Sequence, residues 1–394
     1  MKQIHVIGVI SIFLLTIFQP CTIPAAPVKP ATGPSSKADG PVAGKQPAGQ
    51  GEWERTLQAA RTEGKVVMYT TSWGPQIRKA LTEALKEKFG ITLEFMPFSR
   101  GADLTARVQQ EKTAGAGGAD IFGAGGGTLI SIFKPQGLMG NLEPLLHFPE
   151  VTDARSWRGG KMPFLDRDKQ IIIMAAGAQR YIMYNTELIP QGEIATYRDV
   201  LKPQYKGKIT LNDPTVTGAG NAFMGHLGLH LWNAGEAKEY LKQLIKQQEA
   251  VIQRDNRLHV EAVARGKFAI GLAPNEDNAA NFFKSGAPIA MVYPKEGVYV
   301  APGAGCIAVP VKSPHPNATA VFINWLLTRE GQTIYSRSRG TPSMRLDVST
   351  EGINPVFIAQ PGEKLYLPTE ESFEFWGKML TIAKEAVQET APGR

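Results

Sequence analysis

Residues 208–223, KITLNDPTVTGAGNAF, combine features that could bind a small negatively charged group. The apolar run Ile209–Leu211 is followed by Asp213 and Pro214, then by small polar residues and glycines, before a helix expected from about Ala219. The first N–H groups of a helix have no acceptor within the helix, and a glycine-rich entry leaves them accessible to an anion. The stretch lacks the Lys of a phosphate-binding loop and the G-x-G-x-x-G of a dinucleotide fold. It therefore indicates anion binding without a specific nucleotide signal.

Three more loops have a similar composition, and each lies between an expected strand and an expected helix. The four loops are TTSWGP (70–75), GAGGGT (123–128), NDPTVTGAG (212–220) and APNEDNA (273–279). In parallel α/β sheets, ligands bind beyond the carboxyl ends of the strands, where such loops lie. Two loops fall in each half of the chain, so a ligand between the halves could be held from both sides. The expected ligand-binding residues are Thr71, Ser72, Trp73, Gly125, Gly126, Gly127, Thr128, Thr215, Thr217, Gly218, Ala219, Gly220, Asn275, Glu276 and Asp277.

These residues differ in what they could contribute to binding. The glycines let backbone N–H groups approach a ligand, the threonines and Ser72 offer hydroxyls, and Trp73 could cover a planar or apolar part. Glu276 and Asp277 would repel an anion but would accept a hydrogen bond from an amine or hydroxyl. The residues therefore predict a small organic acid, phosphonate or zwitterion, with its acidic end at 217–220. Structural roles remain open: helix capping for the two carboxylates, a plain helix start for 217–220, and core packing for Trp73.

Two arginines and one threonine are further candidates. Arg180 follows a bend at Gly177, and Arg345 lies in the segment TPSMRLD together with Thr341. Each arginine could pair with a ligand carboxylate or with a carboxylate of the protein. Thr341 lies in a turn that could line the same site.

No catalytic or metal-binding pattern is evident. His226 and His230 have the i, i+4 spacing of a zinc helix, but the Glu of H-E-x-x-H and a third ligand are missing, which favours packing. Ser72 and Ser343 have no G-x-S-x-G setting. We therefore expect a binding protein with no enzymatic activity, no cofactor and no metal ligands.

Strands and helices alternate from Trp53 onward. The expected order β-α-β-α-β over 65–134 indicates a parallel sheet with helices on both faces, and a second such alternation follows from about residue 197. A single long helix is expected over 317–339, and another around 373–387. The α/β fold therefore comprises two units.

The N-terminus indicates export. An apolar run, Val6–Phe18, follows a lysine, and Cys21 comes directly after it, as in acylated lipoproteins. Cleavage near Ala25 without lipidation remains open, because Pro20 stands where a small residue is usual. Residues 22–51 are rich in Pro, Gly, Ala and Ser and indicate a flexible tether. The net charge of +7 is scattered along the chain, so nucleic-acid binding is not expected.

The sequence resembles the extracytoplasmic solute-binding proteins of bacterial ABC importers. The resemblance is carried by the loops quoted above and by the segments YKGKITLNDPTVTGAGNAF, VARGKFAIGLAPNEDNA and NATAVFINWLLTREGQ. The resemblance covers about residues 53–348. Within these proteins, the sequence is most similar to the ferric-iron-binding group, which has the type 2 periplasmic-binding fold. It implies two parallel-sheet lobes joined by hinge strands, a monomer, a small-molecule ligand and a membrane permease as partner. The implied division is 1–21 signal peptide, 22–51 tether, 52–180 with 301–345 lobe 1, 181–300 lobe 2, and 346–394 a C-terminal helical segment packed on the lobes.

The chain departs from the ferric binders where iron would be held. The two adjacent tyrosines that bind iron in those proteins correspond to about Glu276 and Asp277 in this sequence. The region of their His ligand corresponds to Ser72-Trp73, and the region of their Glu ligand corresponds to residues 124–126, Ala-Gly-Gly. The resemblance therefore transfers the fold and the transport role but not bare ferric iron. A ferric chelate, a sensory binding module and an enzyme with unrecognised groups remain alternatives.

Overall fold

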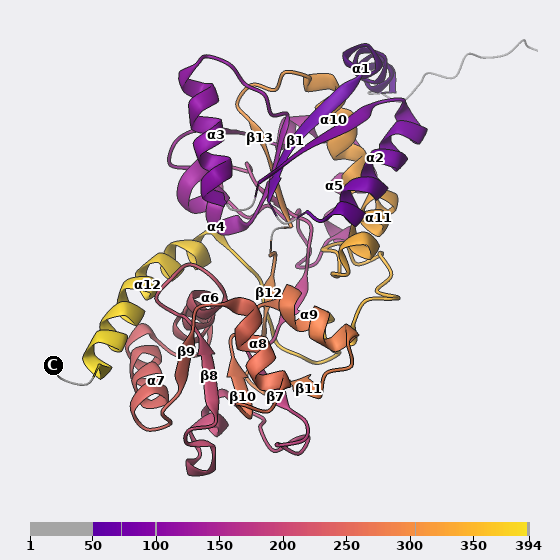
Figure 1. Cartoon of the computed structure of the whole chain (residues 1–394). Coiled ribbons are helices and arrows are strands. Elements are labelled where there is room, and N and C mark those ends of the chain that lie inside the picture. Colours follow the sequence, from indigo (N-terminus) through magenta and orange to yellow (C-terminus); the bar gives the residue numbers. More distant parts are fainter. Residues whose placement is uncertain (1–49, 72, 99–100, 304, 392–394) are drawn as a thin grey trace, which may run out of the picture. The chain divides into compact units, whose positions relative to one another are not determined.

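The structure is a computed structural model that describes residues 50–71, 73–98, 101–303 and 305–391 (Figure 1). The expected signal peptide, Cys21 and most of the expected tether lie outside the described residues, as does Ser72. The first helix, α1 (Gln50–Glu63), begins two residues before the expected end of the tether. All described residues belong to one compact unit of the chain.

One sheet of six strands has the order β2-β1-β3-β13-β4, with β5 also pairing with β13. We call this sheet and the helices packed on it lobe 1. Its strands are β1 (Lys65–Thr71), β2 (Thr92–Phe98), β3 (Ile121–Ala124), β4 (Met139–Gly140), β5 (Ile172–Ile173) and β13 (Cys306–Pro310). Its helices are α1, α2 (Pro75–Phe89), α3 (Gly101–Thr113), α4 (Gly126–Thr128), the π-helix η1 (Leu129–Phe133), η2 (Glu143–Leu145), α5 (Pro149–Thr152), η3 (Ala154–Ser156), α10 (Pro316–Leu327) and α11 (Arg329–Arg339).

A second sheet of five strands has the order β11-β7-β10-β8-β9. This sheet and its helices form lobe 2, with a separate apolar core of buried residues. Its strands are β7 (Ile182–Asn185), β8 (Ile209–Asn212), β9 (Val251–Gln253), β10 (Ile270–Leu272) and β11 (Ile289–Met291). Its helices are η4 (Tyr197–Leu201), η5 (Pro203–Tyr205), α6 (Ala219–His226), the π-helix η6 (Leu227–Leu231), α7 (Ala234–Lys246), α8 (Asn256–Ala264) and α9 (Glu276–Lys284).

A small third sheet marks where the chain passes between the lobes. Strand β12 (Val298–Ala301) pairs with β6 (Gly177–Gln179) and with β14 (Leu365–Tyr366). β6 leads into β7 of lobe 2, and β12 leads back into β13 of lobe 1. Arg180, at this crossing, is fully buried and pairs with Glu363 at 2.7 Å between Nη2 and Oε2. Two extended segments therefore connect the lobes, as expected for hinge strands.

The C-terminal part of the chain returns to both lobes. After η7 (Pro355–Phe357), helix α12 (Glu370–Thr390) packs along α6 and α7 of lobe 2 and reaches η1 of lobe 1 (Figure 1). Thr369 and Ser372 form a capping box at its first turn, which fixes where the helix begins.

Three sequence expectations differ from the structure. Both main sheets are mixed, because β13 runs antiparallel to β3, and β7 runs antiparallel to both β10 and β11. The single helix expected over 317–339 is two helices: Thr328 adopts an extended conformation and its side chain caps α11 by accepting from the N–H of Gly331. Strand β12 was not expected, since VYVA is short and has no clear alternation.

Histidines buried in lobe 2 make stability depend on pH. Burial lowers the pKa of His226 to about 3 and the pKa of His259 to about 4. The folded state therefore binds fewer protons than the unfolded state below about pH 6.5. The stability that the two neutral imidazoles contribute is therefore fully present above that pH and is lost progressively as the pH falls towards their folded-state pKa values.

We expect the unfolding free energy to drop between pH 6.5 and pH 5 by roughly 1 to 2 kcal/mol for each of these imidazoles. Urea unfolding at both pH values measures the drop, and His226→Leu should make it smaller. His147→Gln, at an exposed position, is the matched control. An unchanged pH dependence in His226→Leu would contradict a buried neutral imidazole at this position.

Candidate ligand-binding site

A cavity of ≈ 370 Å³ lies between the two lobes and is lined from both of them. Lobe 1 contributes the loop after β3 and the end of α11, and lobe 2 contributes the start of α6 and the start of α9. The hinge strands and the C-terminal segment complete the wall. Ligand pockets usually measure about 300–1,000 Å³, so this cavity suits a small solute. Its lining residues are Gly125, Gly126, Gly127, Gly177, Gln179, Tyr181, Thr217, Gly218, Ala219, Asn221, Ala222, Asn275, Glu276, Ala280, Tyr299, Ala301, Pro302, Gly303, Arg339, Gly340, Thr341, Phe357, Phe373 and Trp376.

Three of the four expected loops meet at this cavity. Gly125–Gly127, Thr217–Ala219, and Asn275 with Glu276 all line it, and Thr341 lies beside them. The described residues of the loop at 70–75 do not line it. Loops chosen from the sequence on both lobes therefore line one cavity, although only some residues of each loop do so.

The start of α6 presents backbone to the cavity because no side chain caps it. Its N-cap, Gly218, has no side chain to accept from the first N–H groups of the helix. Gly220 is needed for packing: a Cβ there would lie 2.3 Å from the carbonyl oxygen of Asn212. The helix therefore begins directly against the end of β8, with uncapped N–H groups beside the cavity.

The cavity contains charges of both signs. Arg339, at the last turn of α11, lines it and makes no ion pair with any residue the structure describes. Glu276 at the start of α9 lines it as well. Asn275 caps α9, because its Oδ1 accepts from the N–H of Asn278 at 3.1 Å. A cationic and an anionic residue therefore both line the cavity.

Three buried polar side chains from the hinge region also line the cavity. Gln179, Tyr181 and Tyr299 are 7%, 1% and 1% exposed. Within the described part of the chain, the Nε2 of Gln179 and both phenol oxygens have no hydrogen-bond partner. Burial raises the pKa of both tyrosines, so they remain neutral hydroxyls. An unpaired buried polar group costs about 1–3 kcal/mol, which a ligand that pairs with it would recover.

Several expected site residues lie elsewhere. Trp73 is 3% exposed and packs against Phe95 and Tyr335 in the core of lobe 1. Its role is therefore core packing, the structural alternative given for it above. Thr71 is buried in β1, and the Thr128 hydroxyl points to Gly101. Outside the cavity lining are Thr71, Trp73, Thr128, Thr215, Gly220 and Arg180, whereas Ser72 and the Asp277 side chain lie outside the described residues.

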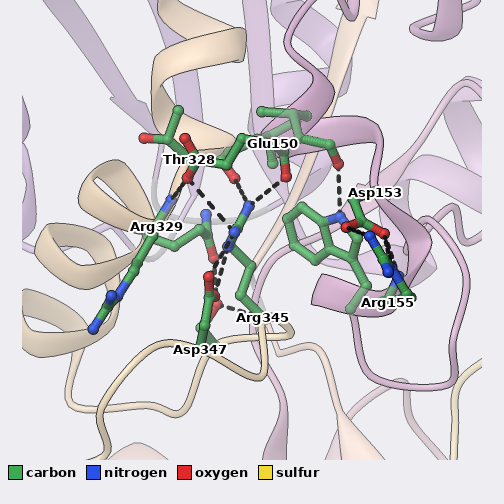
Figure 2. Close-up of polar contacts among 12 residues, drawn as sticks. Glu150, Asp153, Arg155, Thr328, Arg329, Arg345 and Asp347 are labelled. Carbon is green, nitrogen blue, oxygen red and sulfur yellow. Dashed lines mark hydrogen bonds and ion pairs between the residues drawn. The ribbon is translucent and has the colours of Figure 1, made fainter. Parts of the chain in front are cut away.

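Two of these residues and Arg345 have clear structural roles. The Thr215 hydroxyl donates to Asp213 Oδ1 at 2.6 Å within a turn. Arg180 is held by Glu363. Arg345 is 2% exposed and pairs with Asp347 at 2.7 Å, while its Nη1 donates to the Glu150 and Leu327 carbonyls (Figure 2). The two arginines considered from the sequence thus serve the fold, and among the described residues Arg339 is the cation that lines the cavity.

The residues that the sequence analysis missed come from the hinge, α11 and α12. Arg339 stands two residues before Thr341, which was expected at the site, so its position in SRSRGTP was a usable signal. Gln179, Tyr181 and Tyr299 read as ordinary strand residues. Phe373 and Trp376 lie beyond the segment that carries the resemblance.

Residues 80–362 match the family of bacterial extracellular solute-binding proteins. The chain belongs to that family. Members of the solute-binding family capture a small ligand outside the cytoplasm and deliver it to a membrane ABC permease, so this protein has that role and that location. The described residues include no helix long and apolar enough to cross a membrane. They also include no group of three or more His, Cys, Asp or Glu side chains that could hold a metal ion.

Solved structures share the two-lobed type 2 periplasmic-binding fold. The Trichodesmium protein FutA, in complex with iron and citrate, is 18% identical, with a TM-score of 0.66 over 83% of this chain and 99% of its own. The ferric binding protein from Campylobacter jejuni is 18% identical, with a TM-score of 0.64 over 82% and 99%. AfuA from Actinobacillus pleuropneumoniae, with fructose-6-phosphate bound, is 19% identical, with a TM-score of 0.61 over 84% and 100%. At these identities the likeness concerns the fold.

Proposed function

We propose that this solute-binding protein captures a small organic acid, phosphonate or zwitterion in the cavity between its lobes. The observation that carries the proposal is Arg339, a cation that lines the cavity without an ion-pair partner among the described residues. The uncapped start of α6 adds N–H donors for the same acidic group, and Glu276 can accept from an amine or hydroxyl. Binding requires no catalytic step, and we propose that the protein is not an enzyme.

Hinge closure would couple binding to delivery. In this proposal, lobe 1 comprises 52–180 and 301–345, lobe 2 comprises 181–300, and 346–394 packs on both. A ligand that contacts Arg339 on one lobe and the start of α6 on the other stabilises the closed arrangement, which the permease would recognise. We further propose that the exported chain is a monomer that binds no nucleic acid, and that Cys21 is its lipid anchor.

A thermal-shift screen of the purified protein tests the ligand class. We expect stabilisation by organic acids, phosphonates or zwitterions, and none by uncharged polyols or simple amines. A ferric chelate is the second candidate, because a structure of this fold holds iron with citrate. Ferric citrate and citrate alone are therefore separate arms: stabilisation by the chelate only would favour iron transport and contradict a metal-free ligand.

Filling part of the cavity is expected to weaken binding. Ala222 lines the cavity in α6, and Ala222→Leu would place extra carbon atoms in the space that the solute needs. We expect about a tenfold loss of affinity for a solute found in the screen, because overpacking commonly costs about 1–3 kcal/mol. Isothermal titration measures the loss.

The matched control for this substitution is Ala114→Leu, at an exposed position after α3. It should leave affinity unchanged. Full affinity in Ala222→Leu would show that the solute binds elsewhere.

A further inference from the structure

Helix α12 places two aromatic side chains in the wall of the cavity. Phe373 and Trp376 lie one helical turn apart and both line the cavity. Their ring centroids are 4.8 Å apart, and Trp376 meets Tyr299 edge to face at 5.4 Å. The three rings therefore form a continuous apolar surface on one side of a cavity that otherwise contains charged and polar groups.

Two glycines lie directly against these rings, at positions where a Cβ atom would not fit. A Cβ at Gly225 would lie 2.0 Å from Trp376 Cδ1, and a Cβ at Gly126 would lie 2.6 Å from Phe373 Cζ. Asn221, another lining residue, donates from Nδ2 to the carbonyl oxygen of Trp376 at 3.1 Å. The rings are thus seated closely against α6 on one lobe and α4 on the other.

Ion pairs tie α12 to both lobes. At its beginning, Glu370 accepts from Lys134 of lobe 1 at 2.6 Å, and Glu370 is only 8% exposed. Towards its end, Glu389 pairs with Lys238 and Lys242 of α7 at 2.7 and 3.2 Å. The apolar surface is therefore positioned before any solute arrives, which reduces the entropy lost on binding.

We infer that α12 determines specificity, and that the solute is a ring-bearing anion whose apolar ring face packs on Phe373 and Trp376. This inference rests on the proposed function, because it assigns the acidic group of the solute to Arg339. Stacking on aromatic side chains requires a ring with a flat or apolar face, whereas a short acyclic acid would leave this surface bare. The α12 surface thus narrows the class from small anions in general to aromatic or cyclic ones.

Matched probe pairs test the inference. The pairs are phenylphosphonate with methylphosphonate, benzoate with acetate, and glucose 6-phosphate with glycerol 3-phosphate. Within at least one pair, the ring-bearing member is expected to bind about three- to tenfold more tightly, the range given by aromatic contacts. Isothermal titration of the full chain measures each affinity.

Substitutions on α12 separate specificity from folding. Trp376→Leu and Phe373→Leu should bring the ratio of the two affinities within a pair close to one, which removes the preference for the ring. Trp376→Phe keeps a ring and should retain most of the preference, which covers the case in which Trp376→Leu fails to fold. Phe375→Leu is the control, since Phe375 lies on the same helix, contacts Gly228 and does not line the cavity.

The outcomes distinguish the two proposals. Equal affinity for both members of every pair would overturn the inference and leave the anion-binding function intact. Binding of no probe at all would overturn the proposed function and the inference with it. A preference that survives both leucine substitutions would show that α12 is not its source.

Discussion

Replacing Arg339 by methionine is expected to weaken the binding of a small anion by roughly ten- to a hundredfold, because a charge-assisted hydrogen bond contributes about 1.5–3 kcal/mol. Methionine keeps most of the length of the side chain and removes only the cation. Isothermal titration with the best solute from the screen measures the change. The unfolding midpoint should move little, since Arg339 makes no ion pair with another described residue.

Arg337→Met is the matched control for this substitution. Arg337 lies in the same last turn of α11 but is exposed and does not line the cavity. If both variants lose affinity equally, the effect comes from the general charge of the surface. Unchanged affinity in Arg339→Met would remove the main support for an anionic solute.

Arg180→Met is expected to destabilise the protein by about 3–5 kcal/mol, because it leaves a largely buried carboxylate without its cation. Glu363 is 12% exposed at its side chain, and the Val356 and Ile358 carbonyls would also lose the guanidinium as donor. Arg180 further stacks on Tyr293, with its Cζ 4.1 Å from the ring centroid. Guanidinium chloride unfolding at pH 7 measures the loss.

Two comparisons establish the cause of that loss. Arg155→Met breaks a surface pair with Asp153 and should leave the unfolding free energy nearly unchanged, as surface pairs do. The double variant Arg180→Met/Glu363→Gln should recover part of the stability, since no unpaired charge remains. A loss below about 1 kcal/mol in Arg180→Met would contradict a structural role at the hinge.

Much of the fold and part of the site could be predicted from the sequence. Alternating apolar strands and amphipathic helices placed β1, α2, β3, β8 and α9 close to their observed bounds. The glycine-rich loops at 123–128 and 212–220, chosen because small residues follow a strand, each contribute residues to the lining of the cavity. The antiparallel returns through β13 and β7 were not predicted, since strand direction depends on connections that periodicity does not encode.

The remaining site residues required the three-dimensional structure. Arg180, Arg339 and Arg345 are chemically identical in the sequence, and only their surroundings separate two structural ion pairs from one cation at the cavity. The sequence predicted Trp73 to contact a ligand because it follows a strand. In the structure it packs against Tyr335, which belongs to a helix more than 250 residues later in the chain. Phe373 and Trp376 reach the cavity only because α12 packs on both lobes.

A crystal structure of the protein with the most stabilising solute from the screen tests the central claim most directly. We expect the solute between the lobes, with its acidic group within hydrogen-bond distance of Arg339 and of the N–H groups that begin α6, and with its remaining atoms against Trp376. A solute bound at another surface, or in contact with one lobe only, would contradict the account.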